Sequence, residues 1–158
     1  MTVTVSTFED LTLDVVEEIN VRASLDATFD ALLEQIGPAN ETPDGGSLPM
    51  TIEPWPGGRW FRDLGERNGH FWGHVQAIKR PVLLEITGPL FISAPVVSNV
   101  QYRLKEVDGG TMITLRHSAF GLVPDEIRKG LARGWTALVE RVRRKAETHQ
   151  GGRNDVDR

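Results

Sequence analysis

Residues 124–147 read PDEIRKGLARGWTALVERVRRKAE, and this segment decides the fold class. Its apolar side chains recur at helical spacing on one stripe, namely Ile127, Leu131, Trp135, Leu138 and Val142. Pro124 suits a first helical turn, and Asp125 and Glu126 suit the positive end of the helix dipole. A helix of this length extends about 36 Å, which exceeds the radius of a domain of this size. We therefore expect one long helix that crosses a whole sheet.

The beginning of the chain predicts one strand followed by one helix. From Leu11 to Ala23 apolar and polar residues alternate, which is typical of a strand with one buried face. Ser24 is a favourable N-cap, and helical spacing continues to Ile36 before Gly37-Pro38 ends the helix. Residues 37–50 are rich in glycine and proline and predict a loop, which is either mobile or the rim of a pocket.

The middle of the chain predicts antiparallel strands separated by turns. The expected strands are residues 60–64, 69–78, 82–87, 99–107 and 111–118. Asp108-Gly109-Gly110 joins the last two as a hairpin. Because the strands are segregated from the helices, the fold class is α+β, with an antiparallel sheet whose inner face the last helix must cover. We expect one domain over residues 1–148 and a flexible C-terminal tail over residues 149–158.

Composition and charge exclude several classes of protein. The chain has 158 residues, no cysteine and a net charge of −4, so disulfides and thiolate metal sites are ruled out. No apolar run is long enough to span a bilayer, and Met1 to Asp10 lack a secretory pattern, so we expect a cytoplasmic protein. Bases gather where the last helix should end, without aromatic residues among them, which favours a helix-dipole role over nucleic-acid binding. These bases are Arg141, Arg143, Arg144 and Lys145.

Several short motifs follow one another in a fairly specific order. They are Ala23-Ser24, Pro56-Gly57-Gly58-Arg59-Trp60, Gly73-His74-Val75, Asp108-Gly109-Gly110-Thr111, His117-Ser118-Ala119-Phe120 and Gly134-Trp135. On these residues the chain resembles the START-like (SRPBCC) superfamily, and within it the group related to activators of Hsp90 ATPase and to polyketide cyclases. The resemblance covers roughly residues 11–147. It implies a helix-grip fold, in which a curved antiparallel sheet wraps around the long C-terminal helix and leaves an internal cavity.

That cavity directs attention to a cluster of aromatic residues. Three tryptophans and two phenylalanines fall between Trp55 and Trp72, and aromatic walls suit an apolar or flat ligand. Packing within the core is the alternative explanation. The candidate ligand-binding residues are Trp60, Phe71, Val75, Tyr102, Leu115, His117, Leu131 and Trp135. The turn at Pro56-Gly57-Gly58 can shift the strand by one residue and exchange Trp60 with Phe61.

A carboxylate and a histidine are the candidates for catalysis. Glu17 interrupts an apolar strand face, which a bulge, a structural pair or a polar group facing the cavity would explain. His117 lies on the inner face of the last expected strand, which in helix-grip folds pairs with the first. A Glu17–His117 pair, with Tyr102 as polar partner, would act as a general base. A satisfied core histidine is the commoner alternative.

Two further patterns have structural explanations. His70 and His74 would lie about 13 Å apart on a strand, too far to bind one metal ion, so we expect no metal and no cofactor. Gly130 and Gly134 lie one turn apart in the closing helix and each cost about 1 kcal/mol relative to alanine. A strand, a ligand or another subunit must need that space, and packing by the protein itself is the expected cause.

Three functions are compatible with these observations. The first is a module that holds an apolar or aromatic small molecule between the sheet and the last helix, with a homodimer as an option. The second is a cyclase- or hydrolase-type enzyme that uses Glu17 and His117. The third is a co-chaperone-like interaction domain, which the resemblance to Hsp90 activators suggests. We favour the binding module, because the enzyme hypothesis depends on a single residue pair and the fold alone serves many activities.

Overall fold

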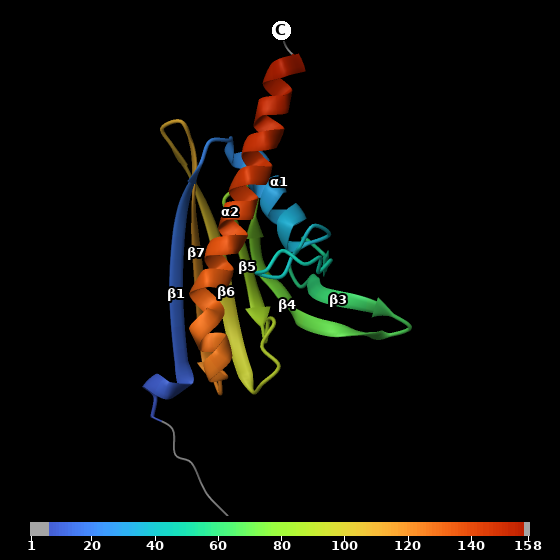
Figure 1. The fold of residues 1–158 in the computed structure, drawn as a ribbon, viewed down its shortest axis with the longest axis vertical. Helices are drawn as coiled ribbons and strands as arrows, with labels where there is room; N and C mark the ends of the chain where they lie inside the picture. Colours follow the sequence, from blue (N-terminus) through green and yellow to red (C-terminus); the bar gives the residue numbers. More distant parts are fainter. Residues whose placement is uncertain (1–6, 157–158) are drawn as a thin grey trace, which may run out of the picture.

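The structure is a computed structural model that describes residues 7–156, and of residues 150–156 it describes the backbone alone. Seven antiparallel strands form one curved, open sheet in the order β1-β7-β6-β5-β4-β3-β2. Two helices lie against its inner face (Figure 1). The elements are η1 (Glu9–Leu11), β1 (Thr12–Val21), α1 (Leu25–Ile36), β2 (Thr51–Ile52), β3 (Arg59–Gly65), β4 (Asn68–Lys79), β5 (Leu83–Gly88), β6 (Val96–Val107), β7 (Gly110–Gly121) and α2 (Asp125–Val156). This is the α+β helix-grip fold that the sequence predicted.

Local sequence explains where the first elements begin and end. The Ser24 side chain accepts a hydrogen bond from the Ala27 amide at 3.1 Å, so α1 starts at the expected N-cap. β1 pairs with β7 without a register shift, which places Val15 opposite His117 and Glu17 opposite Leu115. Strict alternation therefore holds along β1, and the proposed bulge at Glu17 is wrong.

Helix α2 is longer than expected. It begins at Asp125 and ends at Val156, so residues 149–156, which we expected to form a tail, continue the helix. Residues 157–158, the last two of the expected tail, lie outside the described residues. Residues 1–6, which belong to the segment without a secretory pattern, also lie outside them. Leu131 and Leu138 are buried, as the apolar stripe predicted. No helix in the described part of the chain is apolar over a length that would cross a membrane.

A bulge between β3 and β4 decides which aromatic residues face inward. Trp60 pairs with Gly73 and Phe61 with Phe71, so Trp72 is the extra residue on β4. Trp60 and Trp72 are both buried. Phe71 points to the outer face and is 41% exposed. Beyond this bulge the β3–β4 hairpin projects from the body of the molecule (Figure 1).

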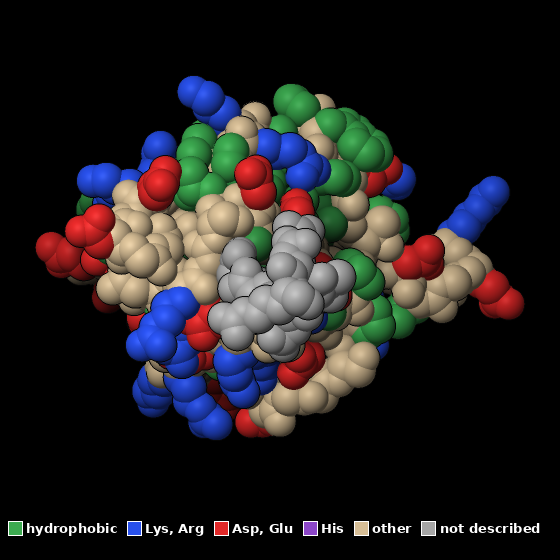
Figure 2. Space-filling view, turned by 90° about the horizontal axis from the view of Figure 1, so that it is seen from above, with side chains coloured by type: hydrophobic (Ala, Val, Ile, Leu, Met, Phe, Trp, Pro, Cys, Tyr) green, Lys and Arg blue, Asp and Glu red, His purple; other side chains and the backbone are tan. Residues whose placement is uncertain are grey.

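Two basic residues of α2 form ion pairs with glutamates of α1 and of the loop that follows α1. Arg141 Nε lies 3.4 Å from Glu41 Oε2, and Lys145 Nζ lies 3.5 Å from Glu34 Oε1. Seen from the end at which α2 terminates, side chains of both charges are spread around the molecule (Figure 2). The ion pairs of Arg141 and Lys145 therefore connect α2 to α1 and to the following loop.

Candidate functional site

A pocket of about 440 Å³ opens between α2, the loop that follows α1, and the inner face of β3 and β4. One wall is the face of α2 from Glu126 to Arg141, and the opposite wall is the loop from Asn40 to Leu48. The loop over residues 37–50 therefore contributes to the pocket rim, which is one of the two alternatives that the sequence left open. Its lining residues are Ile36, Asn40, Glu41, Thr42, Pro43, Leu48, Trp60, Trp72, Phe91, Glu126, Ile127, Gly130, Leu131, Gly134, Trp135, Leu138 and Arg141.

Four aromatic rings form a continuous floor under this pocket. The ring centroids of Trp60 and Trp72 lie 4.9 Å apart in an edge-to-face arrangement. Phe91, from the turn after β5, lies 5.8 Å from Trp72 and 5.9 Å from Trp135. These are the distances and tilts that aromatic pairs prefer, so the floor is packed internally as well as open to the pocket.

Each indole N–H of this floor already has a partner inside the protein. Trp60 Nε1 donates to the Ile36 carbonyl oxygen at 2.8 Å, and Trp72 Nε1 donates to His70 Nδ1 at 3.0 Å. Trp135 Nε1 donates to His117 Nδ1 at 3.1 Å. Because an indole has a single donor, the three rings offer the pocket only their apolar surfaces.

The two glycines of α2 leave the helical wall of the pocket open. A Cβ atom built on Gly130 would have no atom within 4 Å, and one built on Gly134 would meet only Pro43 Cγ, at 3.7 Å. The expectation that close packing by the protein requires these glycines is therefore wrong. Both residues line the pocket, so the space beside them is pocket volume.

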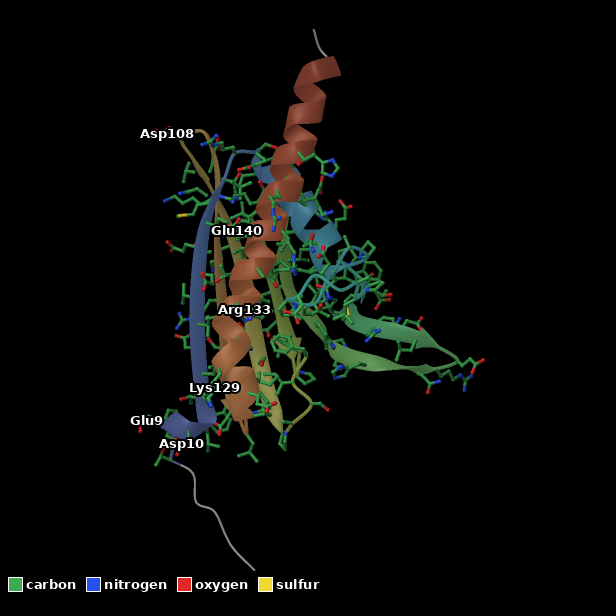
Figure 3. The ribbon with its side chains drawn as sticks, in the orientation of Figure 1. Glu9, Asp10, Asp108, Lys129, Arg133 and Glu140 are labelled. Carbon is green, nitrogen blue, oxygen red and sulfur yellow. The ribbon has the colours of Figure 1, made fainter. Side chains whose placement is uncertain are left out.

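Arg141 holds the loop against α2 at one end of the pocket. Its Nη2 donates to the Pro43 carbonyl oxygen at 3.0 Å, and its Nε lies 3.4 Å from Glu41 Oε2. The Arg141 side chain is only 15% exposed, so this contact is largely shielded from solvent. By contrast, Arg133 and Asp44 approach at 3.7 Å with both side chains more than 80% exposed. Figure 3 shows Arg133 and Lys129 on α2, and both are exposed.

His117 is buried beneath the pocket floor in its neutral form. Nδ1 accepts the hydrogen bond of Trp135, so the ring proton lies on Nε2, which is 2.9 Å from Ser98 Oγ. Burial lowers the pKa of His117 to about 4, against a smaller opposing effect of the Asp14 charge. Both ring nitrogens are therefore occupied by protein groups.

The Glu17–His117 pair that was considered for catalysis is not formed. Glu17 Oε1 accepts a hydrogen bond from the Thr136 hydroxyl of α2 at 3.0 Å, and among the described residues no hydrogen bond joins it to His117. Glu17 therefore forms a structural pair with Thr136, which is one of the three explanations proposed for a carboxylate at this position. Tyr102, the proposed polar partner, is buried with its hydroxyl unpartnered, and burial raises its pKa. The general base that we considered has no oriented partner here.

The candidate ligand-binding residues divide into three groups. Trp60, Leu131 and Trp135 line the pocket. Val75, Tyr102, Leu115 and His117 are buried in the core but do not line it, and Phe71 lies on the outer face against His74. Lining residues that sequence reasoning missed include Phe91 and Leu48, which come from irregular segments without periodicity. Trp72 belonged to the aromatic cluster noted in the sequence, but the β-bulge decides that its side chain faces the inner side of the sheet.

The two histidines of β4 do not form a metal site. His70 accepts the hydrogen bond of Trp72, whereas His74 packs against the Phe71 ring at 4.8 Å. Within the part of the chain that the structure describes, no three His, Cys, Asp or Glu side chains are grouped to hold a metal ion.

Residues 47–146 make up more than half of the chain, and they match the family described as Activator of Hsp90 ATPase homolog 1-like protein. The chain belongs to this family. The matched range runs from the pocket loop through the whole of β2 to β7 and most of α2. Membership therefore rests on the same elements that build the pocket. No curated protein matches the sequence.

Solved structures with the same fold include proteins from several sources. The di-domain ARO/CYC StfQ of the steffimycin biosynthetic pathway aligns with a TM-score of 0.66 and 12% identity, over 91% of this chain and 53% of that one. This family member thus spans about half the length of StfQ. A Chromobacterium violaceum protein aligns with a TM-score of 0.67 and 14% identity, over 85% of this chain and 96% of that one. A Mesorhizobium loti protein aligns with a TM-score of 0.62 and 20% identity, over 86% of this chain and 98% of that one.

Proposed function

We propose that this protein binds an apolar small molecule in the pocket between α2 and the loop over residues 37–50. The observation that carries the proposal is the pair Gly130 and Gly134, which face the pocket without any close protein neighbour that requires them. Glycine inside a helix costs about 1 kcal/mol relative to alanine. A side chain at Gly130 would stabilise the helix and would occupy pocket volume, so we take a ligand, rather than a second subunit, as the reason for leaving the space empty.

Pocket size and chemistry support the same proposal. A volume of about 440 Å³ lies within the range of about 300–1,000 Å³ that is usual for small-molecule sites. Its floor is aromatic, and its walls combine aliphatic side chains with several polar ones. Burial of an apolar ligand here would release about 25 cal/mol for each Å² removed from water.

Binding is favoured over catalysis because no activated group faces the pocket. Glu17 and His117 are engaged separately by Thr136, Trp135 and Ser98, and neither lines the pocket. StfQ is described as an ARO/CYC protein of a biosynthetic pathway, which gives a precedent in this fold for handling small organic molecules. For this chain we propose a binding module whose ligand is held by apolar contact.

The test is a pair of small-to-leucine substitutions on α2. Gly130→Leu adds a side chain at a residue that lines the pocket, and Ala132→Leu adds the same side chain at an exposed residue outside the pocket lining. The uncharged fluorescent probe N-phenyl-1-naphthylamine reports binding by its emission. We expect saturable binding to the wild type and to Ala132→Leu, and a loss of at least tenfold in affinity for Gly130→Leu.

Folding is monitored in the same variants by chemical denaturation. Gly130→Leu should be about 1 kcal/mol more stable than the wild type without ligand, because leucine is the better helix former. A loss of binding accompanied by a gain in stability cannot come from misfolding. Unchanged probe affinity in Gly130→Leu would overturn the proposed function.

A further inference from the structure

We infer that the pocket accepts uncharged apolar ligands and rejects anions of the same carbon skeleton, with Glu126 and the Glu41–Arg141 pair as the specificity-determining groups. This inference rests on the proposed function and concerns the class of ligand. It is carried by the donors, acceptors and charges that line the pocket.

The aromatic floor of the pocket has no free indole donor to offer an anion. The indole N–H groups of Trp60, Trp72 and Trp135 are bound to internal acceptors. Within residues 7–149, the buried side-chain polar atoms without a partner belong to Thr28, Tyr102 and Arg143, and none of these residues lines the pocket. A carboxylate or sulfonate buried on the aromatic floor would lose its hydration without compensation.

The rim does not supply a free cation either. Among the described residues that line the pocket, Arg141 is the one Lys or Arg. Its guanidinium is directed to Glu41 and to the Pro43 carbonyl oxygen, and the side chain is largely buried. An anionic ligand that drew Arg141 away from this contact would leave Glu41 unpaired, which carries a further electrostatic penalty.

Glu126 adds a negative charge at the other end of the pocket. It lies in the first turn of α2 and lines the pocket beside Ile127, and no ion pair of Glu126 is found in the described part of the chain. A helix N-terminus alone would favour an anion, but Asp125 and Glu126 already place two carboxylates in that turn. Of the formally charged lining residues, two are acidic and one is basic, which gives a wall of net charge −1.

Neutral aromatic or terpenoid hydrocarbons fit this wall, and amines are tolerated near Glu126. Fatty acids, sulfonates and ionised phenols are disfavoured. This preference for uncharged ligands follows from the charges and hydrogen-bonding groups of the pocket lining and not from the pocket volume. Two ligands that share one carbon skeleton but differ in charge therefore distinguish it from a preference for shape.

The experiment compares N-phenyl-1-naphthylamine with 8-anilino-1-naphthalenesulfonate, which has the same anilinonaphthalene skeleton and one added sulfonate. Fluorescence titrations give the ratio of the two dissociation constants. Sulfonate binding that persists in Gly130→Leu lies outside the pocket and is subtracted. We expect the neutral probe to bind at least tenfold more tightly to the wild-type pocket.

Three charge-removing variants assign the preference to residues. Glu126→Gln removes the charge from the pocket wall, and Glu41→Gln releases Arg141 toward the ligand. Each substitution should strengthen binding of the sulfonate probe about threefold, as expected for partly screened charges. The dissociation constant of the neutral probe should stay within about twofold of the wild-type value. Asp125→Asn removes the same charge from the same helical turn at a residue outside the pocket lining, and should change the ratio least.

The outcomes separate this inference from the proposed function. Equal affinity of the two probes for the wild-type pocket, or a ratio that Glu126→Gln and Glu41→Gln both leave unchanged, would overturn the inference while the binding function stands. Absence of saturable binding of the neutral probe, or full retention of it in Gly130→Leu, would overturn the proposed function and the inference with it.

Discussion

Trp135 on α2 donates its indole N–H to His117 Nδ1 on β7 across 3.1 Å. This contact orients one wall of the pocket, since Trp135 lines the pocket and His117 does not. It also requires an unprotonated Nδ1, so the position of a pocket residue depends on the protonation state of a residue behind it. A second contact, from His117 Nε2 to Ser98 Oγ at 2.9 Å, completes the buried chain.

Acidification should destabilise the protein through His117. Its pKa is about 4 in the folded protein and about 6.5 when unfolded, so between these values the unfolded state binds more protons. The contribution is fully present above about pH 6.5 and falls by roughly 3 kcal/mol as the pH approaches 4. Denaturant unfolding at several pH values measures this loss.

The control for that measurement is His117→Gln. Glutamine keeps an acceptor for Trp135 and a donor for Ser98 but does not titrate in this range. Acidic groups with lowered pKa values that do not interact with His117, such as Asp10, contribute equally to both proteins and cancel in the difference. If both proteins lose the same stability between pH 6.5 and pH 4, His117 is not the neutral buried group described above.

Gly73→Ala should destabilise the protein by about 1–3 kcal/mol through overpacking. A Cβ atom at this position would lie 2.8 Å from the Thr87 carbonyl oxygen and 2.9 Å from Ile86 Cγ2. Gly130→Ala provides the opposite case, because a Cβ atom at this position would have no close neighbour. This substitution should raise the free energy of unfolding by about 1 kcal/mol. Urea midpoints of the two variants test the contrast, and a shift of the same sign in both would refute it.

Leu131→Ala should cost about 2–3 kcal/mol of unfolding free energy. The residue is buried in the core, but one side of it faces the pocket, which places the cost at the low end of the range for leucine. Leu122→Ala, at an exposed leucine after β7, should change stability little. Equal effects of the two substitutions would show that α2 does not pack across the sheet through Leu131.

Arg141→Met should make ligand release several-fold faster. Methionine retains an apolar stem but removes the contacts to Glu41 and Pro43 that hold the loop against α2. Stopped-flow displacement of N-phenyl-1-naphthylamine measures the rate. Arg133→Met removes a weak, exposed approach to Asp44 and should leave the rate unchanged. Identical release rates in both variants would mean that the loop is not held by Arg141.

Much of the fold could be predicted from local patterns. The stripe from Ile127 to Val142 indicated a buried helix face, and Ser24 marked the start of α1. β6 and β7 were joined where the glycines after Val107 predicted a turn. These features depend on residues that are neighbours in sequence, because helix and strand periodicities and caps are properties of short segments.

The site could be predicted only in part. Trp60, Leu131 and Trp135 line the pocket, but Phe71 and Val75, four residues apart on one expected strand face, lie on opposite sides of the sheet. The bulge at Trp72 reverses the alternation between them. Such a bulge is formed by pairing with β3 and by the close approach of Gly73 to Thr87 on β5.

The sequence by itself determined the element order, the fold class and the family, because hydrophobic periodicity, caps and turns are written in adjacent residues. Only the tertiary structure decided which aromatic rings face the pocket, that His117 pairs with Trp135 and not with Glu17, and that Gly130 borders open space. These outcomes depend on strand register and on contacts between segments far apart in the chain, where a shift of one residue exchanges one face of a strand for the other.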